Sequence, residues 1–324
     1  MRKTLLASLA LVSALGMTLT ACGQPASQGG GTADGKLEKT SLNVGVLPLA
    51  DYAAVYWAKD HGYFDKAGLD VTLTPIQGGP IGIQQAVAGQ LDLSFSNTVS
   101  SAIAVEGGAP VTTVVLTSSL GPQSLGVFVK ADSPVKAITD LDGKTIGINT
   151  TNTIGDVTFR NLVSSQGLNV EPSWVEVPFN EMIAGVQAGS IEAGYLPEPF
   201  ASAAEKAGLR RVVDLSSGPN AGLPISTFVA SNNFVKDNPD TTAAFVDAVY
   251  AAGKDITGKE ADFRQWLPSI AKVPAEVAGT MALPHFETAM SVEKVQSVAD
   301  ILIKQDIIKK FDAGKSTYTT PGKQ

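Results

Sequence analysis

The chain has 324 residues, of which 44% are hydrophobic and 17% are charged, enough apolar material for one large core or for two domains. The 24 Lys and Arg residues against 31 Asp and Glu residues leave a net charge of −7, and no basic stripe could follow a nucleic-acid backbone. A single cysteine excludes internal disulfide bonds, and two histidines, His61 and His285, argue against a zinc or haem site and a His-based catalytic dyad. We therefore expect no nucleic-acid partner, no metal and no cofactor.

The first residues have the pattern of a targeting segment. Arg2 and Lys3 precede an apolar run over residues 5–15, which is shorter than the roughly 20 residues needed to cross a bilayer. The run ends in Leu19-Thr20-Ala21-Cys22, which resembles the bacterial lipobox, and this resemblance implies lipidation of the cysteine and cleavage before it. We expect a signal peptide over residues 1–21 and acyl chains, palmitate among them, on Cys22. The protein would then be anchored to the extracytoplasmic face of the membrane.

Residues 22–40 are expected to form a flexible tether. The segment is rich in Gly, Ser, Gln and Ala, with Gly29-Gly30-Gly31 in its middle, and it has no apolar periodicity. A chain of this length and composition spans roughly 20 to 25 Å on average. It predicts a folded domain held loosely near a membrane surface.

From Leu42 onward, apolar strands alternate with amphipathic helices, a pattern typical of α/β proteins with mostly parallel sheets. Three segments recur in order about 100 residues later, among them a helix that ends at Gly89 or Gly189 and is followed by a strand. The paired segments are 43–46 with 145–148, 67–71 with 166–170, and 85–92 with 185–192. They predict two similar lobes, each with the order β-α-β-α-β.

The segments between and after these repeats predict how the lobes connect. β-rich runs over 111–119, 124–130 and 223–231 are separated by Gly and Pro and indicate two crossings between the lobes. The chain is helical from residue 238 onward, and we expect these helices to cover the first lobe. The expected lobes are 41–126 with 226–324, and 127–225.

Ligands of such sheets bind beyond the carboxyl ends of the strands, near helix N-termini. Six loops meet this condition, three in each half, and they carry polar and aromatic side chains that could bind a small solute. The candidate ligand-binding residues are Asp51, Tyr52, Gly79, Ser96, Asn97, Thr98, Thr150, Asn152, Thr153, Glu181, Tyr195 and Glu198. For Asp51, Asn152 and Asn180 the alternative is that each only caps a helix.

The sequence also resembles a known family. Residues 50–58, followed by Gly62-Tyr63-Phe64 and by 68–71, look like the start of nitrate/sulfonate/taurine-type periplasmic binding proteins, and 88–92, 140–144 and Glu198-Pro199 also match. The resemblance covers roughly residues 41–310. It implies a two-lobed periplasmic-binding-protein-like fold of type II and a monomer that captures a small solute between its lobes. It further implies delivery of that solute to the permease and ATPase subunits of an ABC importer. Binders of the thiamine pyrimidine precursor, riboflavin and aromatic acids belong to the same family.

Motifs of catalysis match poorly. Gly143-Lys144-Thr145 lacks the first glycine of a phosphate-binding loop, because Ile138 stands there, and Pro122 replaces the first glycine of a nucleophile elbow over 122–126. We therefore expect no enzyme. Two alternatives remain: an enzyme of the same fold, such as a pyrimidine synthase or a porphobilinogen-deaminase-like protein, and a ligand sensor associated with a receptor. Such a deaminase would need a cysteine for its cofactor, and the synthase a histidine-rich site.

The charges of the six loops favour a ligand that donates hydrogen bonds. None of these loops contains Lys or Arg, Arg160 being the nearest, whereas Asp51, Glu181 and Glu198 place negative charge at the expected cleft. We expect a zwitterion such as taurine, or a neutral or cationic nitrogen heterocycle stacked on Tyr52 or Tyr195, ahead of nitrate.

Overall fold

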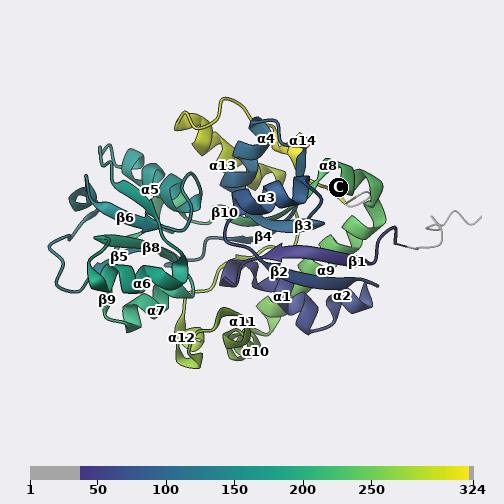
Figure 1. Ribbon diagram of the computed structural model, residues 1–324, viewed down its shortest axis with the longest axis horizontal. Coiled ribbons are helices and arrows are strands. Elements are labelled where there is room, and N and C mark those ends of the chain that lie inside the picture. Colours follow the sequence, from purple (N-terminus) through teal and green to yellow (C-terminus); the bar gives the residue numbers. More distant parts are fainter. Residues whose placement is uncertain (1–36, 321–324) are drawn as a thin grey trace, which may run out of the picture. The chain divides into compact units, whose positions relative to one another are not determined.

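A computed structural model describes residues 37–320 (Figure 1). The expected signal peptide, Cys22 and residues 22–36 of the expected tether lie outside the described residues. Residues 38 and 39 are held in place at the start of a long helix. The Glu38 carboxylate accepts hydrogen bonds from the backbone N–H groups of Asp240 and Thr241, and the Lys39 N–H donates to Thr241 Oγ1. We therefore propose a tether that ends before residue 38 instead of at residue 40.

Two mixed sheets organise the fold. The first has the strand order β11-β4-β10-β3-β1-β2 and the second the order β7-β6-β8-β5-β9. The first sheet consists of β1 (Ser41–Val46), β2 (Asp70–Pro75), β3 (Leu93–Asn97), β4 (Val111–Ser119), β10 (Pro224–Ser231) and β11 (His285–Phe286). The second consists of β5 (Leu125–Lys130), β6 (Thr145–Ile148), β7 (Ser173–Glu176), β8 (Ala193–Pro197) and β9 (Leu209–Asp214).

The predicted internal repeat corresponds to one parallel triplet in each sheet. Strand β1 lies parallel to β2 and β3, and β6 lies in the same way between β7 and β8. A carboxylate before the third strand of each triplet accepts a hydrogen bond from the backbone of the central strand: Asp92 from Asn43 N–H, and Glu192 from Thr145 N–H. The same local sequence thus builds the same contact twice.

The expectation of mostly parallel sheets is wrong in detail. Strand β10 runs antiparallel to β3 and β4, and β5 runs antiparallel to β8 and β9. These are the strands that follow the two crossings, so they enter their sheets from the opposite direction. Their positions also assign 125–126 to the second sheet and 224–225 to the first, two residues from each expected lobe boundary. We propose lobes that change sheet at 120–124 and at 215–223.

Helices cover both sheets. Around the first sheet lie a 3₁₀ helix (Ala50–Tyr52), α1 (Ala53–Asp60), α2 (Tyr63–Lys66), α3 (Gly79–Val87), α4 (Thr98–Glu106) and α8 (Asn232–Asp237). The second has 3₁₀ helices Ile138–Leu141 and Gly218–Asn220, α5 (Ile154–Ser165), α6 (Phe179–Ala188) and α7 (Phe200–Lys206). In Figure 1, α5 lies on one side of the second sheet, and α6 and α7 lie on the other.

The C-terminal helices pack mainly on the first lobe, as the sequence predicts. They are α9 (Pro239–Gly258), α10 (Glu260–Trp266), α11 (Pro268–Ala271), α12 (Ala275–Thr280), α13 (Val292–Lys304) and α14 (Ala313–Ser316). Helix α9 contacts α1, α2 and β4, and α13 contacts α4. Some contacts reach the other lobe: α12 packs against α7, and Gln305 at the end of α13 accepts a hydrogen bond from Arg160 and donates one to the Val157 carbonyl of α5.

Candidate functional site

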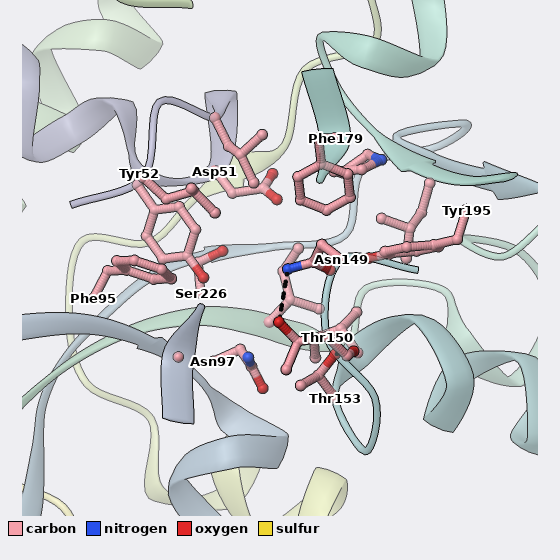
Figure 2. Close-up of a pocket in the computed structure, with 17 residues that line it drawn as sticks. Asp51, Tyr52, Phe95, Asn97, Asn149, Thr150, Thr153, Phe179, Tyr195 and Ser226 are labelled. Atoms are coloured by element: carbon pink, nitrogen blue, oxygen red, sulfur yellow. Dashed lines mark hydrogen bonds between the residues drawn. The ribbon is translucent and has the colours of Figure 1, made fainter. Parts of the chain in front are cut away.

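A cavity lies between the two lobes, at the carboxyl ends of their strands (Figure 2). Its volume is about 40 Å³. The first lobe contributes Leu47, Leu49, Asp51, Tyr52, Gly79, Phe95, Asn97, Ile225 and Ser226. The second contributes Leu125, Asn149, Thr150, Thr153, Ile154, Phe179, Tyr195 and Pro197. A molecule in this cavity would therefore touch both lobes.

Seven of the twelve residues predicted from the sequence border the cavity. They are Asp51, Tyr52, Gly79, Asn97, Thr150, Thr153 and Tyr195. They converge because each lies in, or shortly after, a strand whose carboxyl end faces the other lobe.

Asp51 is the distinctive group of the cavity. It lies in the 3₁₀ helix after β1, its side chain is 5% exposed, and no described group donates a hydrogen bond to its carboxylate. Figure 2 shows this carboxylate pointing from beside Tyr52 toward Phe179. Burial, with a smaller contribution from the charge of Glu198, raises the pKa of Asp51 to about 7. A buried carboxyl without a protein partner is costly, so this position favours a ligand that supplies hydrogen-bond donors or positive charge.

Aromatic side chains form the walls on either side of Asp51. The Tyr52 hydroxyl donates to the Ser96 carbonyl at 2.8 Å, and the edge of its ring meets Phe95 at 5.0 Å between centroids. On the other lobe Tyr195 lies 6.0 Å from Phe179. Burial raises the pKa of both tyrosines, so both hydroxyls stay neutral. These rings give the cavity rigid apolar faces.

Polar groups lie along the side of the cavity away from Asp51 (Figure 2). Asn97 caps α4, since its Oδ1 accepts a hydrogen bond from Ser100 N–H at 2.8 Å, which leaves its amide Nδ2 as a donor. Thr153 Oγ1 donates to the Thr150 carbonyl at 2.8 Å, and Asn149 Nδ2 lies 3.4 Å from Thr150 Oγ1. This side can therefore orient a polar ligand by neutral hydrogen bonds.

Five predicted residues do not border the cavity: Ser96, Thr98, Asn152, Glu181 and Glu198. Ser96 is buried and accepts the Tyr52 hydroxyl through its backbone, and Thr98 Oγ1 donates to the Pro224 carbonyl. Both therefore hold the wall in place from behind. Asn152 and Glu181 are exposed.

Glu198 does not border the cavity. It is 1% exposed, and its carboxylate accepts hydrogen bonds from Ser202 N–H, from Ser202 Oγ and from Ala282 N–H of the first lobe. Burial raises the pKa of Glu198. The residue thus acts on the site through its charge, by raising the pKa of Asp51, and it joins the lobes behind the cavity.

Asp51, Asn152 and Asn180, for which helix capping was the alternative interpretation, do not occupy N-cap positions. The residues at the N-caps of the relevant helices are Leu49, Thr153 and Pro178, not Asp51, Asn152 or Asn180. Asn152 instead has a positive φ of 55°, a conformation that Asn tolerates better than most residues. The capping asparagine of the site is Asn97.

The charges around the cavity are negative. None of the residues that border it is Lys or Arg. Arg160 forms an ion pair with Asp156 at 3.1 Å, and Asp156 also accepts hydrogen bonds from the N–H groups of Asn152 and Thr153 at the start of α5. The α5 N-terminus therefore already has a carboxylate of its own, which weakens its attraction for an anionic ligand.

Sequence reasoning missed several cavity residues because their signals indicate strands and core. Phe95 lies within β3, and Ile225 and Ser226 lie in β10, a run that predicts a crossing between lobes but not a wall. Leu47 and Leu49 are apolar residues in a loop. Phe179, at the start of α6, lies in one of the six predicted loops and borders the cavity as well.

Across residues 37–320, no group of three or more His, Cys, Asp or Glu side chains could hold a metal ion. Within the same range no helix is both long and apolar enough to pass through a bilayer.

Two α/β lobes joined by crossing segments, with a cavity between the ends of their sheets, define the periplasmic-binding-protein class of folds. The sequence pattern of the NMT1/THI5-like family matches residues 50–259, and the chain belongs to this family. YtlA of Bacillus subtilis, which is named as a binding protein, is 26% identical over 238 residues, or 68% of this chain and 71% of YtlA.

Solved structures show the same fold. The alkanesulfonate-binding protein SsuA from Xanthomonas axonopodis, bound to MOPS, has a TM-score of 0.73 at 17% identity and covers 87% of this chain and 99% of its own. The nitrate-binding protein NrtA from Synechocystis has a TM-score of 0.69 at 18% identity, covering 87% and 86%. The desulfurization enzyme DszB also matches, with a TM-score of 0.65 at 17% identity and coverage of 85% and 95%. The fold by itself therefore does not separate binding proteins from enzymes.

Proposed function

We propose that this protein is the extracytoplasmic solute-binding component of an ABC importer, which captures a small polar solute between its lobes and delivers it to permease and ATPase subunits. The observation that carries the proposal is the cavity bordered by both lobes, with Asp51 buried in it and lacking a protein partner. A ligand that contacts both lobes binds the closed form better than the open form, which is how a hinged protein signals that it is loaded. Family membership and the named binding function of its relative support the same role.

The proposed ligand carries hydrogen-bond donors or positive charge. The Asp51 carboxylate is a hydrogen-bond acceptor, and the ligand would supply the donor. The residues bordering the cavity include no Lys or Arg to balance the charge of an anion. The candidates are a neutral or cationic nitrogen heterocycle against the Tyr52 or Tyr195 ring, and a zwitterion such as taurine. Nitrate fits this cavity less well, because an anion would meet the charge of Asp51.

The proposed location is the outer face of the cell membrane. A signal peptide over 1–21, lipidation of Cys22 with palmitate among its acyl chains, and a tether after it are supported by the lipobox-like sequence. In this arrangement a monomer would work close to its permease.

A binding role is favoured over catalysis. The residues that border the cavity include no His, Cys or Lys, the side chains that most often act as bases or nucleophiles. A sensor that passes its loaded state to a receptor would use the same cleft. Uptake measurements therefore decide between transport and sensing.

The test begins with the native ligand. The protein is purified from its host without denaturation and then unfolded, and the released compound is identified by mass spectrometry. Uptake of that compound, isotopically labelled, is compared in a deletion strain carrying the native gene, Asp51→Asn or the exposed-site control Asp65→Asn. We expect the native gene and the control to restore uptake and Asp51→Asn to fail. Full uptake in the deletion strain would contradict an importer role.

A further inference from the structure

A second cavity adjoins the first. Its volume is about 240 Å³, and four of its bordering residues, Leu47, Leu49, Asn149 and Phe179, also border the first cavity. The two spaces therefore share a boundary. We refer to the space at Asp51 as the inner cavity and to the second as the outer cavity.

The outer cavity is apolar on both lobes. Leu47, Leu49 and Ile76 border it from the first lobe, and Phe179 and Phe200 from the second. The rings of Phe179 and Phe200 stack at 5.6 Å between centroids with 23° between their planes. No charged residue borders this space, and its polar side chains are amides. An apolar group that moves from water into a space with such walls gains free energy.

The order of the two cavities indicates the order of groups in the ligand. Among the buried carboxylates of residues 37–320, the one without a hydrogen-bond partner, Asp51, lies in the inner cavity, and the aromatic pair lies toward the outer one. A solute that consisted only of a polar head would leave the outer cavity filled with water. A solute with an apolar body would bury that body against both lobes and so add to the preference for the closed form.

We infer, on the basis of the proposed function, that the ligand is an organic base with an apolar body. Its nitrogen-bound hydrogens contact Asp51. Its aromatic or branched aliphatic body lies between Phe179 and Phe200 on one side and Leu47 and Ile76 on the other. The site then selects its ligand by two features, the basic head and the apolar body. The residues that select the body, Phe200 and Ile76, border only the outer cavity and are separate from those that select the head.

Four probes separate the two determinants in calorimetric titrations of the refolded, ligand-free protein. They are 2-phenylethylamine, which has both groups, ethylamine with the head alone, 2-phenylethanesulfonate with an anionic head on the same body, and taurine. Burying a ring of this size is worth roughly a 10-fold to 150-fold gain in affinity, so 2-phenylethylamine should bind more tightly than ethylamine by that factor. Both amines should bind more tightly than 2-phenylethanesulfonate.

Variants then assign the gain to the outer cavity. Phe200→Ala should weaken binding of 2-phenylethylamine by roughly 10-fold or more and leave ethylamine unaffected. Ile76→Ala, on the opposite wall, should have the same selectivity and serves if Phe200→Ala does not fold. Val175→Ala is the matched control, because it truncates an exposed apolar side chain outside both cavities.

Each outcome has a distinct meaning. Equal affinity for ethylamine and 2-phenylethylamine would refute the apolar body of the ligand. The same conclusion would follow if Phe200→Ala and Ile76→Ala changed binding of 2-phenylethylamine no more than Val175→Ala does. Neither result would bear on the importer role. Tighter binding of 2-phenylethanesulfonate than of 2-phenylethylamine would overturn the basic head. Failure of all four probes to bind would overturn both parts of this inference, whereas the uptake experiment judges the proposed function independently.

Discussion

Asp51→Asn should stabilise the ligand-free protein while it removes the charge that the ligand needs. Burial and the nearby charge of Glu198 raise the pKa of Asp51 from 3.8 to about 7. The folded protein therefore holds this proton more tightly than the unfolded chain does. As a result, the free energy of unfolding falls as the pH rises from about 4 to about 7, and this loss is constant above that range. Asn has the same shape and no charge, so the variant avoids the loss.

The magnitude follows from the same pKa difference. At about 1.4 kcal/mol for each pH unit, Asp51→Asn should raise the free energy of unfolding by about 1 kcal/mol at pH 4.5 and by about 4 kcal/mol at pH 8. The other titratable groups at the site, Glu198, Tyr52 and Tyr195, are present in both proteins. Their own titrations largely cancel in the difference between variant and native protein.

Urea unfolding followed by tryptophan fluorescence measures this difference at each pH, using protein refolded after removal of any bound solute. Asp65→Asn removes one carboxylate from an exposed position and should change the free energy of unfolding by less than about 0.5 kcal/mol. Destabilisation by Asp51→Asn at pH 8, or an effect that does not grow with pH, would refute the reasoning. Either result would mean that the Asp51 carboxylate is solvated or paired and does not need a hydrogen-bond donor from a ligand.

Three further predictions concern binding, closure and anchoring. Binding of 2-phenylethylamine should weaken roughly 30-fold between pH 8 and pH 5.5, because Asp51 must lose its proton to meet the cation; calorimetry at both pH values checks this, and constant affinity would contradict it. Gly78→Val should hinder closure, since a Cβ at this extended residue would lie 2.8 Å from Thr150 Oγ1 of the other lobe. We expect affinity to fall roughly 5-fold to 150-fold. Small-angle scattering should then show no ligand-induced decrease in the radius of gyration, and a normal decrease would exclude this contact as a requirement for closure. Cys22→Ala should leave the precursor uncleaved and without acyl mass in mass spectrometry, whereas a mature, unmodified native protein would disprove lipidation.

Local sequence determines the strands, the helices and the repeat. The glycine-terminated helices before residues 91 and 191 recur with the same spacing, and each is followed by a carboxylate, Asp92 or Glu192, that binds its neighbouring strand. Such patterns are readable because the signals for capping and alternation lie within a few residues of one another. They also locate the loops at strand ends, and for that reason seven of the predicted residues border one cavity. The direction of the crossing strands is not readable in this way, because it depends on which edge of a finished sheet the chain meets.

Only the tertiary structure decides which polar groups of those loops face the ligand. Asp51 and Glu198 are both acidic loop residues, yet Glu198 is bound by Ser202 and by the N–H of Ala282, more than 80 residues away, whereas Asp51 has no such partner. Whether a carboxylate is available therefore depends on contacts from segments distant in the sequence. The outer cavity also depends on contacts between distant segments, because Ile76 and Phe200 belong to different lobes. Their apolar character predicts that they are buried, but it does not predict which residues they face. Packing the two lobes against each other leaves these apolar side chains facing a space open to a ligand, and no short segment of the sequence contains that information.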